Sequence, residues 1–135
     1  MTQPSKTYAK LVAAIVVVLV VAGCASEPSL TPGTYTSTIT REDTTSFLFI
    51  GDWGLMLTEE NGYGLTKDGE FWEEGNYALT GDQIAVTMSE GTYPCGATGT
   101  YTWTSDGKGL TLTTVEDTCE GRPNILTMHP WSLQD

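Results

Sequence analysis

The sequence predicts an all-β domain, an up-and-down antiparallel meander closed into a small barrel of about eight to nine strands and preceded by a signal peptide. Three observations support this prediction. The first 23 residues differ from the rest, no helical periodicity follows residue 30, and short alternating runs recur between turn dipeptides. Short hairpins pair neighbouring strands antiparallel, and closure removes exposed edges. An open sandwich of two sheets is the competing architecture, which the short, even hairpin spacing disfavours.

The N-terminal segment has the three parts of an export signal. Lys6 and Lys10 precede 13 uncharged residues, 11–23, which are shorter than the ~20 residues of a spanning helix. Small residues at Ala22 and Gly23 stand directly before Cys24. This arrangement resembles the bacterial lipobox, whose cysteine receives a diacylglyceryl group and becomes the new N-terminus. An ordinary secretory peptide, or a short uncleaved anchor, is the alternative.

These features divide the chain into three parts. Residues 1–23 are the predicted lipoprotein signal peptide, residues 24–31 a lipidated tether, and residues 32–135 the barrel domain. Lipid on Cys24 would anchor the domain to a membrane on the extracytoplasmic side of the cell envelope.

The predicted mature chain is strongly acidic. The whole sequence has a net charge of −11, and without Lys6 and Lys10 four basic residues face 17 acidic ones, a net charge of −13. Such a surface repels phosphate backbones and anionic headgroups, so we expect no nucleic-acid binding and no electrostatic attachment to membranes. Solubility outside the cell is the simplest role for this charge, and we expect a monomer.

The strands of the first half follow from alternation and turns. Residues 33–40 are rich in Thr, Tyr and Ile, residues 46–50 form a short apolar run, and Trp53, Leu55 and Leu57 share one face of residues 53–59. Asn61-Gly62 predicts a type I′ turn before residues 63–66. Asp68-Gly69 predicts the next turn, before residues 71–79.

The second half continues the pattern. Gly75 predicts a bulge or a bend within residues 71–79, and Gly81-Asp82 turns into residues 83–89. Tyr101 and Trp103 alternate with threonines, and Asp106-Gly107 turns into residues 109–115. Residues 124–129 are the last predicted strand.

Three segments resemble a known family. "PGTYTSTIT" at the first strand and "GDWGLMLTEENGYGLTKDGEFWEEGNYALTGDQIAV" after it are similar to small bacterial lipocalin-like domains, as is "GTYTWTSDGKGLTLTTVEDTCEGR". The resemblance covers residues 32–131 and implies a calycin-type barrel whose relatives bind small hydrophobic molecules. It implies that Gly33-Thr34-Tyr35, or alternatively Gly51-Asp52-Trp53, stands for the family's Gly-x-Trp, and that Arg122 packs across the first-strand aromatic. No C-terminal helix is expected.

Cysteine arithmetic predicts one disulfide. If Cys24 carries lipid, Cys95 and Cys119 remain with only one possible pairing, in a compartment that permits disulfides. Two buried free thiols are the alternative.

Catalytic constellations are not evident in the sequence. His129 is the only histidine and has no Gly-x-Ser-x-Gly motif to work with. The acidic pairs, such as Glu73-Glu74, are adjacent on strands and point to opposite faces. Calcium at the hairpin tip of residues 66–70 is conceivable, but the spacing of an EF-hand is missing. We therefore expect no enzyme, no metal and no cofactor.

The aromatic residues are the remaining functional signal. If they face inward, they could line a ligand cup, or they could simply fill a small barrel. The first hypothesis is a membrane-tethered barrel that binds a small hydrophobic ligand. The alternative is a filled barrel that serves as an interaction module, such as an inhibitor or an envelope-assembly partner. The candidate ligand-binding residues are Tyr35, Trp53, Tyr63, Tyr77, Tyr101, Trp103 and Arg122.

Overall fold

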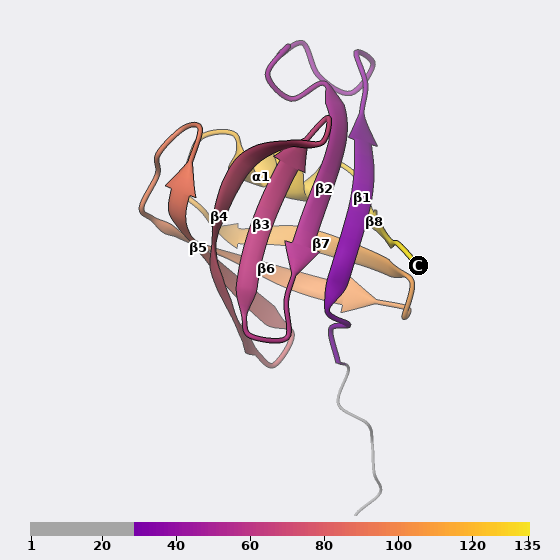
Figure 1. Ribbon diagram of the computed structural model, residues 1–135, viewed down its shortest axis with the longest axis vertical. Helices are drawn as coiled ribbons and strands as arrows, with labels where there is room; N and C mark the ends of the chain where they lie inside the picture. The colour runs from indigo at the N-terminus through magenta and orange to yellow at the C-terminus, as the bar shows by residue number, and fades with distance from the viewer. Residues whose placement is uncertain (1–28) are drawn as a thin grey trace, which may run out of the picture.

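The computed structural model describes residues 29–135, whose eight strands form a closed barrel (Figure 1). The predicted signal peptide and Cys24 lie outside the described residues. A short helix, α1 (Arg122–Thr127), stands between the last two strands. The strands are β1 (Gly33–Ile39), β2 (Gly51–Leu57), β3 (Gly62–Lys67), β4 (Glu70–Thr80), β5 (Gln83–Gly91), β6 (Thr98–Ser105), β7 (Gly109–Glu116) and β8 (Trp131–Leu133).

The strands follow one another around the barrel as an antiparallel meander. Tyr35 on β1 is opposite Leu55 of β2 on one side and Leu133 of β8 on the other, so β1 and β8 close the ring. Leu110 of β7 is opposite Trp131 of β8. The predicted all-β meander barrel is therefore confirmed, with eight strands.

Two predicted strands are wrong. Residues 46–50 belong to the loop between β1 and β2, where the Phe49 N–H donates to the Ser46 carbonyl and Phe47 is 77% exposed. Residues 124–129 lie mainly in α1, so the expectation of no C-terminal helix is also wrong. Gly121, with φ 88°, makes the turn into α1, and Pro123 occupies its first turn, where a missing N–H costs nothing.

The turn chemistry is confirmed in part. Asp68 and Gly69 both have positive φ, 51° and 81°, as a tight two-residue hairpin requires. The predicted type I′ turn at Asn61-Gly62 is wrong, because only Asn61 has positive φ and Gly62 begins β3. The Gly62 N–H donates instead to Thr58 Oγ1 at 2.7 Å, within a longer connection.

The bulge predicted at Gly75 is present. The register between β4 and β5 shifts after Glu74, and the extra residue, Ser89, lies on β5. A Cβ at Gly75 would stand 1.8 Å from the Thr87 carbonyl oxygen, so only glycine permits this approach of the two backbones.

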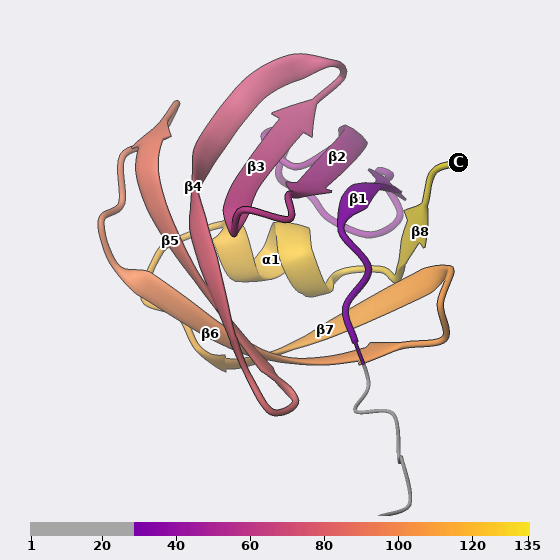
Figure 2. The ribbon, with the colours of Figure 1, turned by 60° about the horizontal axis from the view of Figure 1, so that its bottom comes forward.

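Apolar side chains fill the interior of the barrel. Alternate residues of the strands point inward, and Ile125 and Leu126 of α1 pack onto them from within the curve of the sheet (Figure 2). The most deeply buried large side chains include Tyr35, Trp53, Tyr101 and Trp131. Trp53 Nε1 donates to the Phe49 carbonyl at 2.8 Å, which ties the loop between β1 and β2 to the core.

The two ends of the barrel differ. We call one the loop end: it comprises residues 40–50, 92–97 and 117–121 together with α1 (Figure 1). The opposite, turn end carries the short connections at 58–61, 81–82 and 106–108. The chain enters β1 at the turn end, where Leu30 is buried and the Tyr35 hydroxyl donates to the Thr31 carbonyl.

Candidate functional site

A cavity of about 510 Å³ opens at the loop end of the barrel. Its walls come from the loop between β1 and β2, the start of β4, the loop between β5 and β6, and the segment that leads into α1. The volume falls within the ~300–1,000 Å³ typical of small-molecule sites. The lining includes Phe49, Trp72, Glu73, Tyr93, Glu120 and Arg122.

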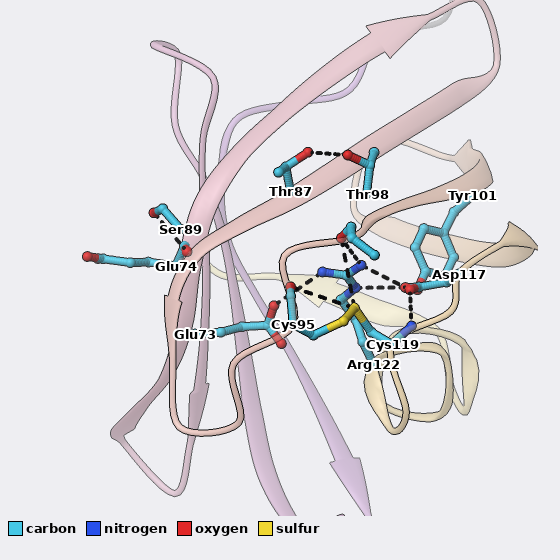
Figure 3. Close-up of polar contacts among 11 residues, drawn as sticks. Glu73, Glu74, Thr87, Ser89, Cys95, Thr98, Tyr101, Asp117, Cys119 and Arg122 are labelled. Carbon is cyan, nitrogen blue, oxygen red and sulfur yellow. Dashed lines mark hydrogen bonds and ion pairs between the residues drawn. A yellow bond between two sulfur atoms is a disulfide. The ribbon is translucent and has the colours of Figure 1, made fainter.

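A buried ion pair forms the floor of this region (Figure 3). Arg122 Nε donates to Asp117 Oδ2 at 2.7 Å, and Nη2 donates to Asp117 Oδ1 at 2.9 Å and to the Ala97 carbonyl at 2.8 Å. The Tyr101 hydroxyl and the Cys119 N–H also donate to the Asp117 carboxylate. Asp117 thus accepts hydrogen bonds from Cys119, just before α1, from Arg122, the first residue of α1, and from Tyr101 of β6. These bonds fix the start of α1 against the barrel.

These contacts determine the charge states. Burial opposes ionisation of Asp117, but the hydrogen bonds from Arg122 and Tyr101 outweigh it and lower the pKa of Asp117. Burial likewise opposes the charge on Arg122, yet its bond to Asp117 raises the pKa of Arg122. Burial and the adjacent carboxylate raise the pKa of Tyr101. The pair is therefore a stable carboxylate–guanidinium unit at neutral pH.

Glu73 adds a second carboxyl group that is less well partnered. Its side chain is 7% exposed, and its Oε2 lies 3.7 Å from Arg122 Nη1. Among the described residues, Glu73 Oε2, Arg122 Nη1 and the Tyr63 hydroxyl are buried atoms without a hydrogen-bond partner. Burial raises the pKa of Glu73, although the charge of Arg122 acts in the opposite direction. A buried polar group without a partner is costly, so these three atoms mark an unusual site.

Aromatic rings form one wall of the cavity. The Trp72 and Tyr93 ring centroids are 5.3 Å apart with an interplanar angle of 51°, and Trp53 meets Trp72 edge-on at 4.9 Å. The Lys67 ammonium lies 5.9 Å from the centre of the Trp72 ring. Tyr93 is 56% exposed, so this wall borders the cavity mouth.

A second β-bulge explains the position of Trp72. Leu65 of β3 is opposite Glu73, whereas the next residue, Thr66, is opposite Phe71. Trp72 is therefore the extra, unpaired residue of β4. Because a bulge bends its strand and redirects a side chain, Trp72 and Glu73 both line the cavity although neighbours on a regular strand face opposite ways.

The disulfide joins two walls of the cavity. Cys95, between β5 and β6, is bonded to Cys119, which precedes α1, with a Cα–Cα distance of 5.8 Å. The predicted pairing is confirmed. Figure 3 shows the bond beside the Arg122 guanidinium.

The candidate residues from the sequence are all buried, and six of the seven belong to one packed core cluster rather than to the cavity lining. Tyr35, Trp53, Tyr77 and Trp103 belong to the packed core. Tyr101 and Tyr63 lie in or beside the ion-pair cluster, and Arg122 is the one candidate that lines the cavity. The polar contacts of Arg122 are with carboxylates and a carbonyl group.

Sequence reasoning missed Phe49, Glu73 and Tyr93 as cavity residues, and it counted Trp72 among the aromatic residues that could line a ligand cup without including it in the candidate set. One signal could have found Tyr93. Tyr93 stands two residues before Cys95, and Cys119 stands three residues before Arg122. The expected pairing of the two cysteines therefore implies that Tyr93 lies close to Arg122.

His129 has a structural partner. Its Nε2 lies 2.8 Å from Asp43 Oδ2, which links the segment after α1 to the loop between β1 and β2. The hydrogen bond from His129 lowers the pKa of Asp43. Within residues 29–135, no three His, Cys, Asp or Glu side chains are grouped so that they could hold a metal ion.

None of the helices in the described part of the chain has the length and apolar character needed to cross a membrane. No family model, curated protein or solved structure matches this chain.

Proposed function

We propose that this chain is a lipid-anchored, extracytoplasmic binding protein, with lipid on Cys24 and a small, largely apolar ligand in the loop-end cavity. The proposal depends chiefly on the cavity itself, which has a volume of about 510 Å³ and an aromatic wall with a few polar groups at its floor. Ligand sites commonly have this composition. We propose binding rather than catalysis, because within residues 29–135 the only histidine, His129, is paired with Asp43 and does not line the cavity.

The packed interior changes where the ligand would lie. Tyr35, Trp53 and Trp103 fill the barrel, so the cup predicted inside it is replaced in this proposal by the cavity at its loop end. Phe49, Trp72 and Tyr93 supply the aromatic contacts.

Tryptophan fluorescence tests ligand binding. An apolar ligand in the cavity should quench or shift the emission of Trp72, and Trp72→Phe should remove that response. Trp103→Phe is the matched control, because Trp103 lies in the core and does not line the cavity. Native mass spectrometry of protein from its own host gives the second readout. If no ligand copurifies and apolar probes leave the emission unchanged, the binding role is wrong.

The anchor has a separate test. The supporting features are the charged, apolar and small-residue parts that precede Cys24, and a disulfide compatible with an oxidising compartment. Cys24→Ala should abolish acylation and move the protein from the membrane fraction to soluble or unprocessed forms. A Cys24→Ala protein that is cleaved as before and stays in the membrane fraction would contradict the proposal.

A second candidate function is an interaction module, favoured by apolar side chains around the cavity mouth. Leu48, which is 48% exposed, and Tyr93, which is 56% exposed, both line the cavity, and Phe47, the neighbour of Leu48 in the sequence, is 77% exposed. A photo-crosslinker at Phe47 would capture a protein partner in the host. The same group at Met56, an exposed apolar residue of β2, is the control. Crosslinks specific to Phe47, without a bound small molecule, would favour the module.

A further inference from the structure

We infer that the loop-end cavity selects a small organic cation, an amine or quaternary ammonium on an apolar body, over an anion of the same size. This inference rests on the proposed binding function and specifies the ligand's chemistry. It follows from the charges that line the cavity, from the aromatic wall and from an unpartnered carboxylate oxygen.

The charges at the cavity are mostly negative. Glu73 and Glu120 line it, and the one positive side chain in the lining is Arg122. The Arg122 guanidinium donates two hydrogen bonds to the Asp117 carboxylate, which compensates its charge, and a third to the Ala97 carbonyl. The remaining nitrogen, Nη1, faces Glu73 Oε2 at 3.7 Å. An anion that approached Nη1 would therefore also approach a second carboxyl group, which repels it.

The aromatic wall also favours a cation. The faces of Trp and Tyr rings are negative, and they attract ammonium groups within about 6 Å of the ring centre. Trp72 and Tyr93 both line the cavity. The Lys67 ammonium already lies 5.9 Å from the Trp72 ring centre, so this ring accepts a cation in the protein itself.

Glu73 supplies the second, independent observation. Its side chain is more than nine-tenths buried, and its Oε2 lacks a hydrogen-bond donor. A buried carboxylate is unfavourable unless a charge or a donor compensates it. Arg122 supplies a charge 3.7 Å away but no hydrogen bond, and a ligand ammonium at the cavity floor would supply the missing donor. The net charge of −13 on the predicted mature chain also draws cations toward the protein from solution.

The experiment compares three probes with the same eight-carbon chain: octyltrimethylammonium, octanol and octanoate. Binding to the lipidated mature protein is followed by tryptophan emission, in which Trp72 is the expected reporter, and by calorimetry, at pH 7 and at low and physiological salt. We expect the ammonium probe to bind at least about tenfold more tightly than octanoate, with an affinity that falls as salt rises.

Matched variants identify the groups responsible. Glu73→Gln should weaken binding of the ammonium probe about tenfold, the effect of one lost charge contact, while octanol binding stays the same. Glu74→Gln is the control, because Glu74 is the next residue, is exposed and does not line this cavity. Should Glu73→Gln perturb the fold, Glu120→Gln removes an exposed lining charge and should give a smaller loss in the same direction.

The outcomes separate the inference from the proposed function. If octanoate or octanol binds as tightly as the ammonium probe, the cation inference is wrong but the binding function stands. If no probe binds and no ligand copurifies with the protein, both are wrong. Equal losses from Glu73→Gln and Glu74→Gln would also overturn the inference, since they would reflect overall charge rather than the cavity.

Discussion

Arg122 and Asp117 form a buried, bidentate ion pair, with Nε–Oδ2 and Nη2–Oδ1 distances of 2.7 and 2.9 Å. Their side chains are 2% and 0% exposed. Asp117→Asn should lower the free energy of unfolding by about 3–5 kcal/mol, because it leaves a buried guanidinium without its compensating charge. Urea denaturation followed by circular dichroism measures this loss.

The control for that prediction removes both charges. Arg122→Met with Asp117→Leu should cost less than Asp117→Asn alone, because no buried charge is left without its partner. A single Asp117→Asn variant as stable as the unaltered protein would mean that the pair has little effect on stability.

The stability of the protein should depend on pH through Glu73. Its pKa is raised above the ordinary value of 4.5, so the folded state holds this proton more tightly than the unfolded state does. The resulting stabilisation is complete below about pH 4.5 and is lost as pH rises through the folded pKa. Glu73→Gln should flatten this part of the stability profile, whereas Glu74→Gln should not. Urea denaturation from pH 4 to 8 provides the comparison, and identical profiles for the two variants would contradict the prediction.

Asp117 should act in the opposite direction. Its pKa lies below the ordinary value of 3.8, so its contribution is present above that pH and is lost as pH falls through the folded pKa. Acid unfolding of the unaltered protein should therefore be steeper below pH 3.8 than that of Asp117→Asn. If the two proteins lose stability equally steeply below pH 3.8, the folded state does not favour the charged form of Asp117.

The disulfide should contribute about 3 kcal/mol on the loop-entropy model. Cys95→Ala with Cys119→Ala should lose that amount, and a reducing agent should lower the stability of the unaltered protein to the same level. Denaturation with and without the reductant measures both effects. A double variant that retains full stability would contradict the prediction, as would recovery of both free thiols from protein exported by its own host.

Trp103 should behave as a core residue. Trp103→Ala should cost about 3–5 kcal/mol, because it leaves a large cavity in a packed interior. Trp103→Phe should cost less, since the indole Nε1 has no hydrogen-bond partner among the described residues and removing it breaks no bond. Urea denaturation of the two variants distinguishes them. Equal losses would show that the indole N–H has a partner or that the phenyl ring does not pack.

The strands were predictable where their signal is local. Alternation at Tyr101 and Trp103, and at Trp53, Leu55 and Leu57, follows from the two-residue period of a strand. Residues 46–50 were misassigned because an apolar run indicates burial, yet Phe47 is exposed in a loop. The segment 124–129 is too short for a helical period to appear. Its local signals were the positions of Gly121 and Pro123.

The cavity depends on contacts that the sequence does not show locally. Trp72 reaches it through a bulge opposite Leu65 and Thr66, and none of the residues at this register shift, 65–66 and 71–73, is a glycine. Glu73 and Arg122 are 49 positions apart in the sequence and meet only when the barrel closes. The disulfide was the one long-range contact that residue types alone could predict.

The chain enters β1 at the turn end, opposite the cavity, where Leu30 is buried and Thr31 is bonded to Tyr35. Six residue steps separate Cys24 from Leu30, which even a fully extended chain spans in only about 20 Å. With lipid on Cys24, this short tether would hold the turn end against the bilayer and leave the cavity mouth facing away from it. A molecule that enters the cavity would then come from the surrounding fluid, or from a protein on the far side, rather than from the leaflet that holds the anchor.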